Sequence, residues 1–164
     1  MTSNTAGRGA RPRAPRWLTA DQDAAWRALA ALTVHLPWAL ECQLQRDAGL
    51  SFIEYHVLAG LSENQGHTLR MSELAAMTHA SLSRLSHMFK RLEARGFVRR
   101  EPDAADRRYT LAILTDTGHR HLVDSAPAHV ETVRRLVIDA LSPEQLGNVN
   151  EAAERILERI HPPS

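Results

Sequence analysis

The sequence has one cysteine, no long apolar run and no apolar core near its start, and each of these features excludes a class of protein. The single cysteine, Cys42, leaves no disulfide within the chain and favours a reducing compartment. No apolar run approaches the roughly 18–20 residues that a membrane helix needs, so we expect no membrane partner. The first sixteen residues, MTSNTAGRGARPRAPR, lack the apolar core of a secretory signal. These shortages predict a cytoplasmic protein.

The sequence also lacks the motifs of common enzymes. It has no Gly-rich phosphate loop, no nucleophile elbow and no metalloprotease motif. Nine histidines invite a metal hypothesis, but the closest pair, His119 and His121, would point to different faces of a predicted helix. We therefore expect neither an enzyme nor a bound metal or cofactor.

The net charge is +1, but the charged residues are distributed unevenly along the chain. Residues 1–16 carry four arginines and no acid, and residues 70–108 carry nine basic against five acidic residues. Residues 17–69 and 109–164 are both net acidic. A local basic block is typical of proteins that bind a polyanion, although a solvated mixed surface would explain the charges alone equally well.

The pattern of apolar residues predicts a mainly α-helical chain with a small β-hairpin. Residues 1–16 are predicted to be a disordered basic tail, because Gly, Ser, Pro and Arg leave little to bury. Apolar spacing, capping residues and glycine stops then predict six helices, and alternation predicts two strands. The predicted helices span 19–47, 51–63, 70–78, 81–95, 117–140 and 143–161, and the strands span 97–101 and 109–115. Pro37 lies inside the first helix, where we expect a kink.

The fourth predicted helix has two chemically different faces. At 100° per residue its inner face is apolar and comprises Leu85, Met88, Phe89 and Leu92. The opposite face and its flanks carry only hydroxyl, imidazole and cationic groups, on Ser83, Arg84, Ser86, His87, Lys90 and Arg91. A merely solvated face would usually mix Glu with Lys. Donor-rich groups instead suit phosphate oxygens and base edges in a major groove.

The elements around this helix are typical of a winged helix-turn-helix. The short third helix reaches the fourth through THAS, which is the spacing of a helix-turn-helix. The hairpin tip carries Arg107 and Arg108, which would reach an adjacent minor groove, and Asp106 is expected to orient one of them. Alternation predicts that Tyr109, Leu111 and Ile113 face the core. The alternative is an ordinary polar turn without a partner.

A long central segment resembles the winged-helix core of the MarR family of bacterial transcriptional regulators. It reads MSELAAMTHASLSRLSHMFKRLEARGFVRREPDAADRRYTLAILTDTG, and its most specific parts are RLEARGFVRR, DRR before a strand, and LTDTG. The likeness extends over about residues 19–160, and WLTADQDAAWRAL resembles the actinobacterial branch. It implies a winged helix-turn-helix over residues 49–116 and dimerisation helices over 17–48 and 117–161.

The resemblance also implies how the protein works. An obligate homodimer would bind a pseudo-palindromic operator in double-stranded DNA, with half-sites about one helical turn apart. The recognition helix, residues 81–95, would lie in the major groove, and the wing, residues 101–109, in the minor groove. The implied contacts are Ser83, Arg84, Ser86, His87, Lys90 and Arg108, with Asp106 orienting the last. Leu82 departs from a position that is commonly polar in the family. Independently, the apolar stripe of the last helix requires a partner.

These observations predict a sequence-specific transcriptional regulator, in particular a repressor released by a small ligand. The alternative is a low-specificity architectural DNA-binding protein, helped by the tail arginines Arg8, Arg11, Arg13 and Arg16. The two differ in specificity, since a regulator should prefer its operator over random DNA by ~10³-fold or more. A dimeric module without DNA binding is disfavoured, because the outward face and the wing keep their basic groups.

The resemblance further implies a small aromatic effector in a cleft between the dimerisation helices and the DNA-binding lobe. By position, the cleft would be lined by Trp38, Glu41, Cys42, Tyr55 and His56. Each residue also has a simpler explanation: core packing for Trp38 and Tyr55, a small buried apolar group for Cys42, and an ordinary histidine for His56. No basic residue adjoins Cys42 apart from Arg46 one helical turn on, so the sequence does not indicate redox sensing.

Overall fold

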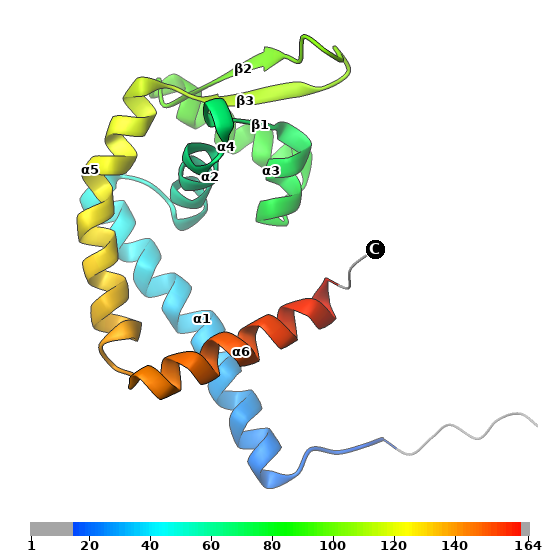
Figure 1. Ribbon diagram of the computed structural model, residues 1–164, viewed down its shortest axis with the longest axis vertical. Helices are drawn as coiled ribbons and strands as arrows, with labels where there is room; N and C mark the ends of the chain where they lie inside the picture. Colours follow the sequence, from blue (N-terminus) through cyan, green and yellow to red (C-terminus); the bar gives the residue numbers. More distant parts are fainter. Residues whose placement is uncertain (1–14, 162–164) are drawn as a thin grey trace, which may run out of the picture. The chain divides into compact units, whose positions relative to one another are not determined.

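The computed structural model describes residues 15–161, so all but the last two residues of the predicted basic tail lie outside the described chain. The described helices are α1 (Ala20–Ala48), α2 (Phe52–Glu63), α3 (Met71–Thr78), α4 (Leu82–Ala94), α5 (Asp116–Val133) and α6 (Pro143–Ile160). The strands are β1 (Thr68–Arg70), β2 (Val98–Pro102) and β3 (Thr110–Leu114) (Figure 1). The predicted fold class, mainly α with a small β wing, is confirmed. None of the described helices is long and apolar enough to cross a membrane.

The chain divides into two compact units, residues 1–34 and residues 35–164. The described part of the first unit is the beginning of α1, where Thr19 and Gln22 form the predicted capping box through contacts of 3.0 and 3.3 Å. Its large apolar side chains are exposed, namely Trp17, Leu18, Trp26, Leu29, Leu32 and Val34. Pro37 lies inside α1 and does not end the helix.

The core of the second unit forms where α2, α3 and α4 pack with the sheet and the start of α5. Its fully buried side chains include Leu50, Val57, Leu58, Leu61, Leu74, Leu85, Phe89 and Leu92. All four residues predicted for the inner face of α4 are buried. Because this face fills the core, the opposite face of α4 must point outward.

The sheet has three antiparallel strands in the order β1-β3-β2, one strand more than predicted. The three-residue β1 is too short to show a period of its own, and it follows the 3₁₀ turn Gln65–His67. The hairpin of β2 and β3 forms the wing (Figure 1).

The prediction for the buried face of β3 was wrong. Ala112 and Leu114 are buried, whereas Leu111 and Ile113 are half-buried and Tyr109 is exposed. Residues 111–114 are all apolar, so alternation by itself does not decide between the two faces. The pairing of Leu114 with the buried Val98 of β2 places both residues on the core side of the sheet.

Helix caps and the glycine that terminates α4 occur where the local sequence predicts them. Ser51 and Glu54 complete a capping box on α2, and Ser142 and Gln145 complete one on α6. Gly96 ends the α4 segment with φ 71°, in the left-handed region that glycine adopts without strain. The predicted single helix over 117–140 was wrong in one respect, because a π-helical turn, Arg134–Ile138, follows α5.

Gly118 of the LTDTG segment is required by close packing, and its replacement should destabilise the protein. A Cβ there would lie 2.1 Å from the Phe97 carbonyl oxygen and 2.8 Å from Leu114 Cδ1. Gly118→Ala should therefore lower the free energy of unfolding by at least about 1 kcal/mol. Gly147→Ala is the matched control, since a Cβ on that helical residue meets nothing within 4 Å. Urea denaturation measures the free energy of unfolding of both variants and of the wild type. A Gly118→Ala variant as stable as Gly147→Ala would contradict the prediction.

Candidate nucleic-acid interface

The outward face of α4 presents the side chains predicted to contact DNA. Ser81 caps the helix by accepting a hydrogen bond of 3.3 Å from the backbone N–H of Arg84. Five of the predicted contact residues on α4 are exposed, namely Ser83, Arg84, His87, Lys90 and Arg91, and Ser86 is half-buried. The helix therefore displays hydroxyl, imidazole and cationic donors to solvent.

The wing carries an oriented arginine beyond the sheet. The Arg108 side chain is 84% exposed, yet its Nε and Nη2 donate to the Asp106 carboxylate at 3.0 and 2.6 Å. The Arg108 backbone N–H also donates to Asp106 Oδ1 at 3.1 Å. Both contacts, the side-chain one foremost, lower the pKa of the Asp106 carboxyl, so this pairing is lost only as pH falls through that lowered pKa. Arg107 is exposed beside it.

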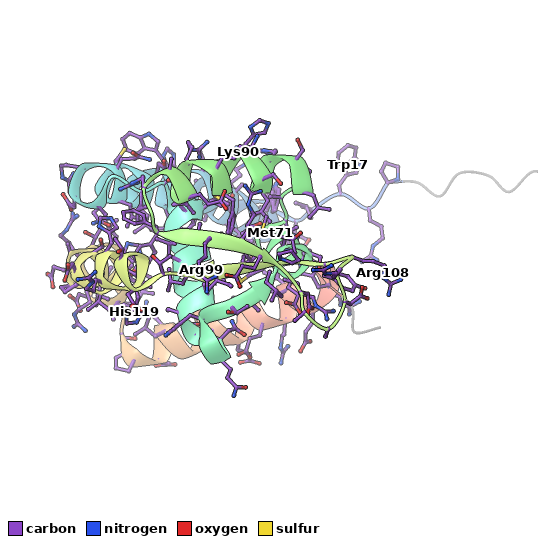
Figure 2. The ribbon with its side chains drawn as sticks, turned by 90° about the horizontal axis from the view of Figure 1, so that it is seen from above. Trp17, Met71, Lys90, Arg99, Arg108 and His119 are labelled. Carbon is purple, nitrogen blue, oxygen red and sulfur yellow. The ribbon has the colours of Figure 1, made fainter. Side chains whose placement is uncertain are left out.

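Residues of α4 and of the wing border one groove. A single groove is lined from α3, α4, β2 and the wing, by Met71, Ser72, Leu82, Ser86, Arg100, Arg108, Tyr109 and Thr110. Figure 2 shows Lys90 on α4 and Arg108 at the outer end of the hairpin. Leu82, the departure noted in the sequence, is an exposed apolar residue on the edge of this groove.

One predicted contact residue, Arg91, has an intramolecular partner. Its Nη2 lies 2.9 Å from Oε1 of Glu54, a nearly buried carboxylate that also caps α2. Arg91 therefore ties α4 to α2, while more than half of its side chain remains exposed. Arg100 likewise pairs with Glu93 at 2.5 Å, which joins β2 to α4.

Two residues that pair at the start of the wing loop, Arg70 and Asp103, were not identified from the sequence. Asp103 is buried, and its Oδ2 accepts hydrogen bonds from Nε and Nη2 of Arg70 at 3.2 and 3.0 Å. The guanidinium carbon of Arg70 lies 4.2 Å from the centroid of the Tyr109 ring. Arg70 and Asp103 are 33 residues apart in the chain, so no local pattern connects them.

Known proteins share the sequence pattern and the fold of this chain. A sequence profile described as MarR family matches residues 48–108. The crystal structure of Sco3205, a MarR family transcriptional regulator from Streptomyces coelicolor in complex with DNA, is 42% identical with a TM-score of 0.87. That match covers 92% of this chain and 94% of the Sco3205 chain. This chain belongs to the MarR family.

Further MarR-family relatives agree with this assignment. AbsC from Streptomyces coelicolor is 42% identical with a TM-score of 0.84, over 89% of this chain and 98% of that one. The transcriptional repressor MprA of Escherichia coli K12 is 25% identical over 112 residues, a match that covers 68% of this chain and 63% of MprA. The two Streptomyces matches confirm the predicted likeness to the actinobacterial branch of the MarR family.

Two of the five residues suggested for a MarR-type effector cleft line separate grooves of the described chain, Glu41 in one and His56 in another. Trp38 is 66% exposed and Cys42 is exposed, so neither is a core residue of the single chain. Glu41 Oε2 accepts a hydrogen bond of 2.5 Å from the Phe52 backbone N–H. His56 lines an apolar groove between α2 and α3 that none of the other four residues enters.

Tyr55 belongs instead to a buried polar junction between α1, α2 and α5. Its ring centroid lies 4.4 Å from that of His129, whose Nδ1 lies 3.0 Å from Gln43 Oε1. Burial, and next the charge of His56, lower the pKa of His129 and favour the neutral ring. The contribution of His129 to stability is therefore complete above the ordinary pKa of histidine, and it declines as pH falls below that value.

Proposed function

We propose that the protein is a transcriptional regulator that binds a pseudo-palindromic DNA operator as a homodimer. In each protomer α4 enters the major groove and the wing reaches the adjacent minor groove. One observation carries this proposal: α4 exposes a donor-rich face, and the groove that Leu82 and Ser86 of α4 line also contains the oriented Arg108. The 42% identity to Sco3205, which was crystallised with DNA, supports it.

The face of α4 has the chemistry that a major groove requires. The exposed side chains of Arg84, His87 and Lys90 donate hydrogen bonds, as phosphate oxygens and the acceptor edges of guanine demand. Ser83 both donates and accepts, so it suits any base edge. The opposite face of α4 is buried in the core, which holds the helix rigidly in place.

The wing has the chemistry that a minor groove requires. A guanidinium is attracted by the concentrated negative potential of a narrow A·T-rich minor groove. The bidentate contact with Asp106 holds the Arg108 side chain in one direction before DNA is bound. An exposed ion pair adds little stability, about 0–1 kcal/mol, so its value lies in orientation.

Unpartnered apolar side chains support the homodimer. No residue of α6 is buried, and its exposed apolar residues are Val149, Ile156, Leu157 and Ile160. Two valines of α5, Val123 and Val130, are exposed as well. Because an amphipathic helix must bury its apolar stripe, a second copy related by a two-fold axis is the proposed cover.

The proposal includes repression that a small aromatic ligand relieves. The exposed indole of Trp38 lies one helical turn from the exposed Cys42, and both offer apolar surface to such a ligand. Because Glu41 and His56 line separate grooves in the described chain, we propose that the second protomer completes this site. Measuring operator affinity in the presence of phenolic ligands, with Trp38→Ala as the comparison, tests this part of the proposal.

Selection of bound fragments from genomic and random DNA tests the function as a whole. We expect a two-fold symmetric consensus whose half-sites lie about one helical turn apart, preferred over random DNA by ~10³-fold or more at fixed salt. Enrichment without a consensus would favour the architectural alternative. An absence of retained DNA would contradict the proposal.

Lys90 should contribute to binding chiefly through a phosphate. Lys90→Ala should reduce the slope of log affinity against log salt by about 0.9 per subunit, because one fewer counterion is released. Fluorescence anisotropy titrations at several salt concentrations measure this slope. Arg46→Ala is the control, since that exposed arginine of α1 pairs with Asp47. A slope that is unchanged in Lys90→Ala would remove this residue from the phosphate contacts.

A further inference from the structure

We propose that Arg70 is a positioning residue for the wing, which it holds through Asp103 and Tyr109 so that Arg108 meets the minor groove in one fixed direction. This inference rests on the proposed DNA-binding function. It assigns a role to a cluster that lies outside the DNA-contacting residues predicted from the sequence.

Arg70 occupies a rigid position between two elements. It is the last residue of β1 and the N-cap of α3, where its backbone N–H donates to Glu73 Oε2 at 2.7 Å. In the sheet it pairs with Leu111 of β3. The main chain of Arg70 is therefore held by both a strand and a helix, which makes it a firm base for the side chain.

The Arg70 side chain donates hydrogen bonds to the first residue of the wing loop, which spans residues 103–109. Its Nε and Nη2 both donate to Oδ2 of Asp103, the residue that follows β2. The other carboxylate oxygen of Asp103 accepts from the Ala105 backbone N–H at 2.9 Å. The carboxylate thus carries the constraint from Arg70 into the backbone of the loop.

The same guanidinium covers the second end of the wing loop. It lies over the ring of Tyr109, the residue that precedes β3. The backbone N–H of Asp103 donates to the Tyr109 carbonyl at 3.0 Å, and the backbone N–H of Tyr109 donates to the Asp106 carbonyl at 3.0 Å. One side chain therefore contacts both ends of residues 103–109, and Asp106 and Arg108 lie between them.

This arrangement reduces the cost of binding DNA. A loop that is free to move must lose conformational entropy when Arg108 enters a groove, whereas a loop already held in place loses less. An arginine suits the task because its planar guanidinium can donate twice to a carboxylate and lie over an aromatic ring at the same time. A lysine keeps the charge but provides neither the planar fork nor the stacking surface.

A double-mutant cycle on the full-length protein tests the inference. Operator affinity is measured for the wild type, Arg70→Ala, Arg108→Ala and the double variant at fixed salt. We expect Arg70→Ala to weaken binding by about 3–10-fold in the wild type and by less than about 2-fold when Arg108 is absent, because contacts that act together are not additive. Equal effects in both backgrounds would overturn the inference and indicate that Arg70 contacts DNA directly.

A second variant separates positioning from simple electrostatics. Asp103→Asn removes a negative charge near DNA, so electrostatics alone predicts tighter binding. Positioning predicts weaker binding, because the amide is a poorer acceptor for Arg70. Glu101→Gln is the matched control on the same hairpin, since Glu101 is exposed and pairs with the neighbouring Arg99. Tighter binding by Asp103→Asn would overturn the inference even if Arg70→Ala failed to fold.

Thermal denaturation and a conservative variant complete the test. Arg70→Lys should recover less than half of the lost affinity while its melting temperature stays close to that of the wild type. Full recovery would show that only the charge matters and would overturn the inference. If Arg108→Ala alone has no effect, the proposed wing contact fails as well. If Arg108→Ala weakens binding, and Arg70→Ala weakens it equally in the wild type and in the Arg108→Ala background, the positioning role fails while the proposed wing contact stands.

Discussion

Replacing two apolar residues of α6 with acids, Leu157→Glu and Ile160→Glu, should produce a monomer and lower operator affinity by at least about 100-fold. The reason is that a dimer binds its second half-site intramolecularly, and linking two sites raises affinity by about 10²–10⁴. Both side chains are more than half exposed in the single protomer, so the acids should not disturb its own core. A charge buried in the proposed interface would be strongly unfavourable.

Sedimentation equilibrium and operator titration measure the two effects together. The matched control removes the ion pair between Glu151 and Arg155, which lies on the polar face of the same helix. Glu151→Ala with Arg155→Ala should leave both the dimer and the affinity unchanged within experimental error. A dimer that persists in the acidic variant would show that α6 is not the interface.

Arg108→Ala should weaken operator binding by about 1–3 kcal/mol without changing the fold or the dimer. The Arg108 side chain is exposed and projects from the wing, so its removal leaves no cavity. The loss should be largest on operators whose A·T-rich segment lies under the wing, because the minor groove is narrowest there. Anisotropy titration against matched A·T-rich and G·C-rich operator flanks measures this difference.

Arg107→Ala is the control for this prediction. Both arginines are exposed at the tip, but within the described chain the bidentate contact with Asp106 is made by Arg108. Arg107→Ala should therefore cause a smaller loss that does not depend on the flanking sequence. Affinity that is unchanged by Arg108→Ala at physiological salt would remove the wing from the mechanism.

Local patterns in the sequence were sufficient to predict most of the helices and the character of α4. A helix with period 3.6 places Leu85, Met88, Phe89 and Leu92 on one side, and no tertiary information is needed to infer that the other side faces outward. Caps such as Ser51 and Ser142 act within four residues, so they too are visible in the sequence. The family resemblance is confirmed for the same reason, because its motifs are contiguous.

The sheet shows where local patterns were insufficient. Four consecutive apolar residues at 111–114 leave the buried face of β3 undecided, and the pairing with β2 selects Ala112 and Leu114. The short β1 becomes a strand only because β3 lies beside it. Strand pairing joins distant segments, so its outcome depends on the whole fold.

The amino-acid sequence alone determined which polar residues α4 and the wing expose: a cationic, hydroxyl-bearing helix face and a pair of arginines at a turn. Only the tertiary structure decided what holds them in place, as in the contacts of Arg70 with Asp103 and of Arg91 with Glu54, which join residues 33 and 37 positions apart. The physical reason is one of range. Helix periodicity and capping act within a few residues, whereas a guanidinium finds its carboxylate only after the chain between them has folded.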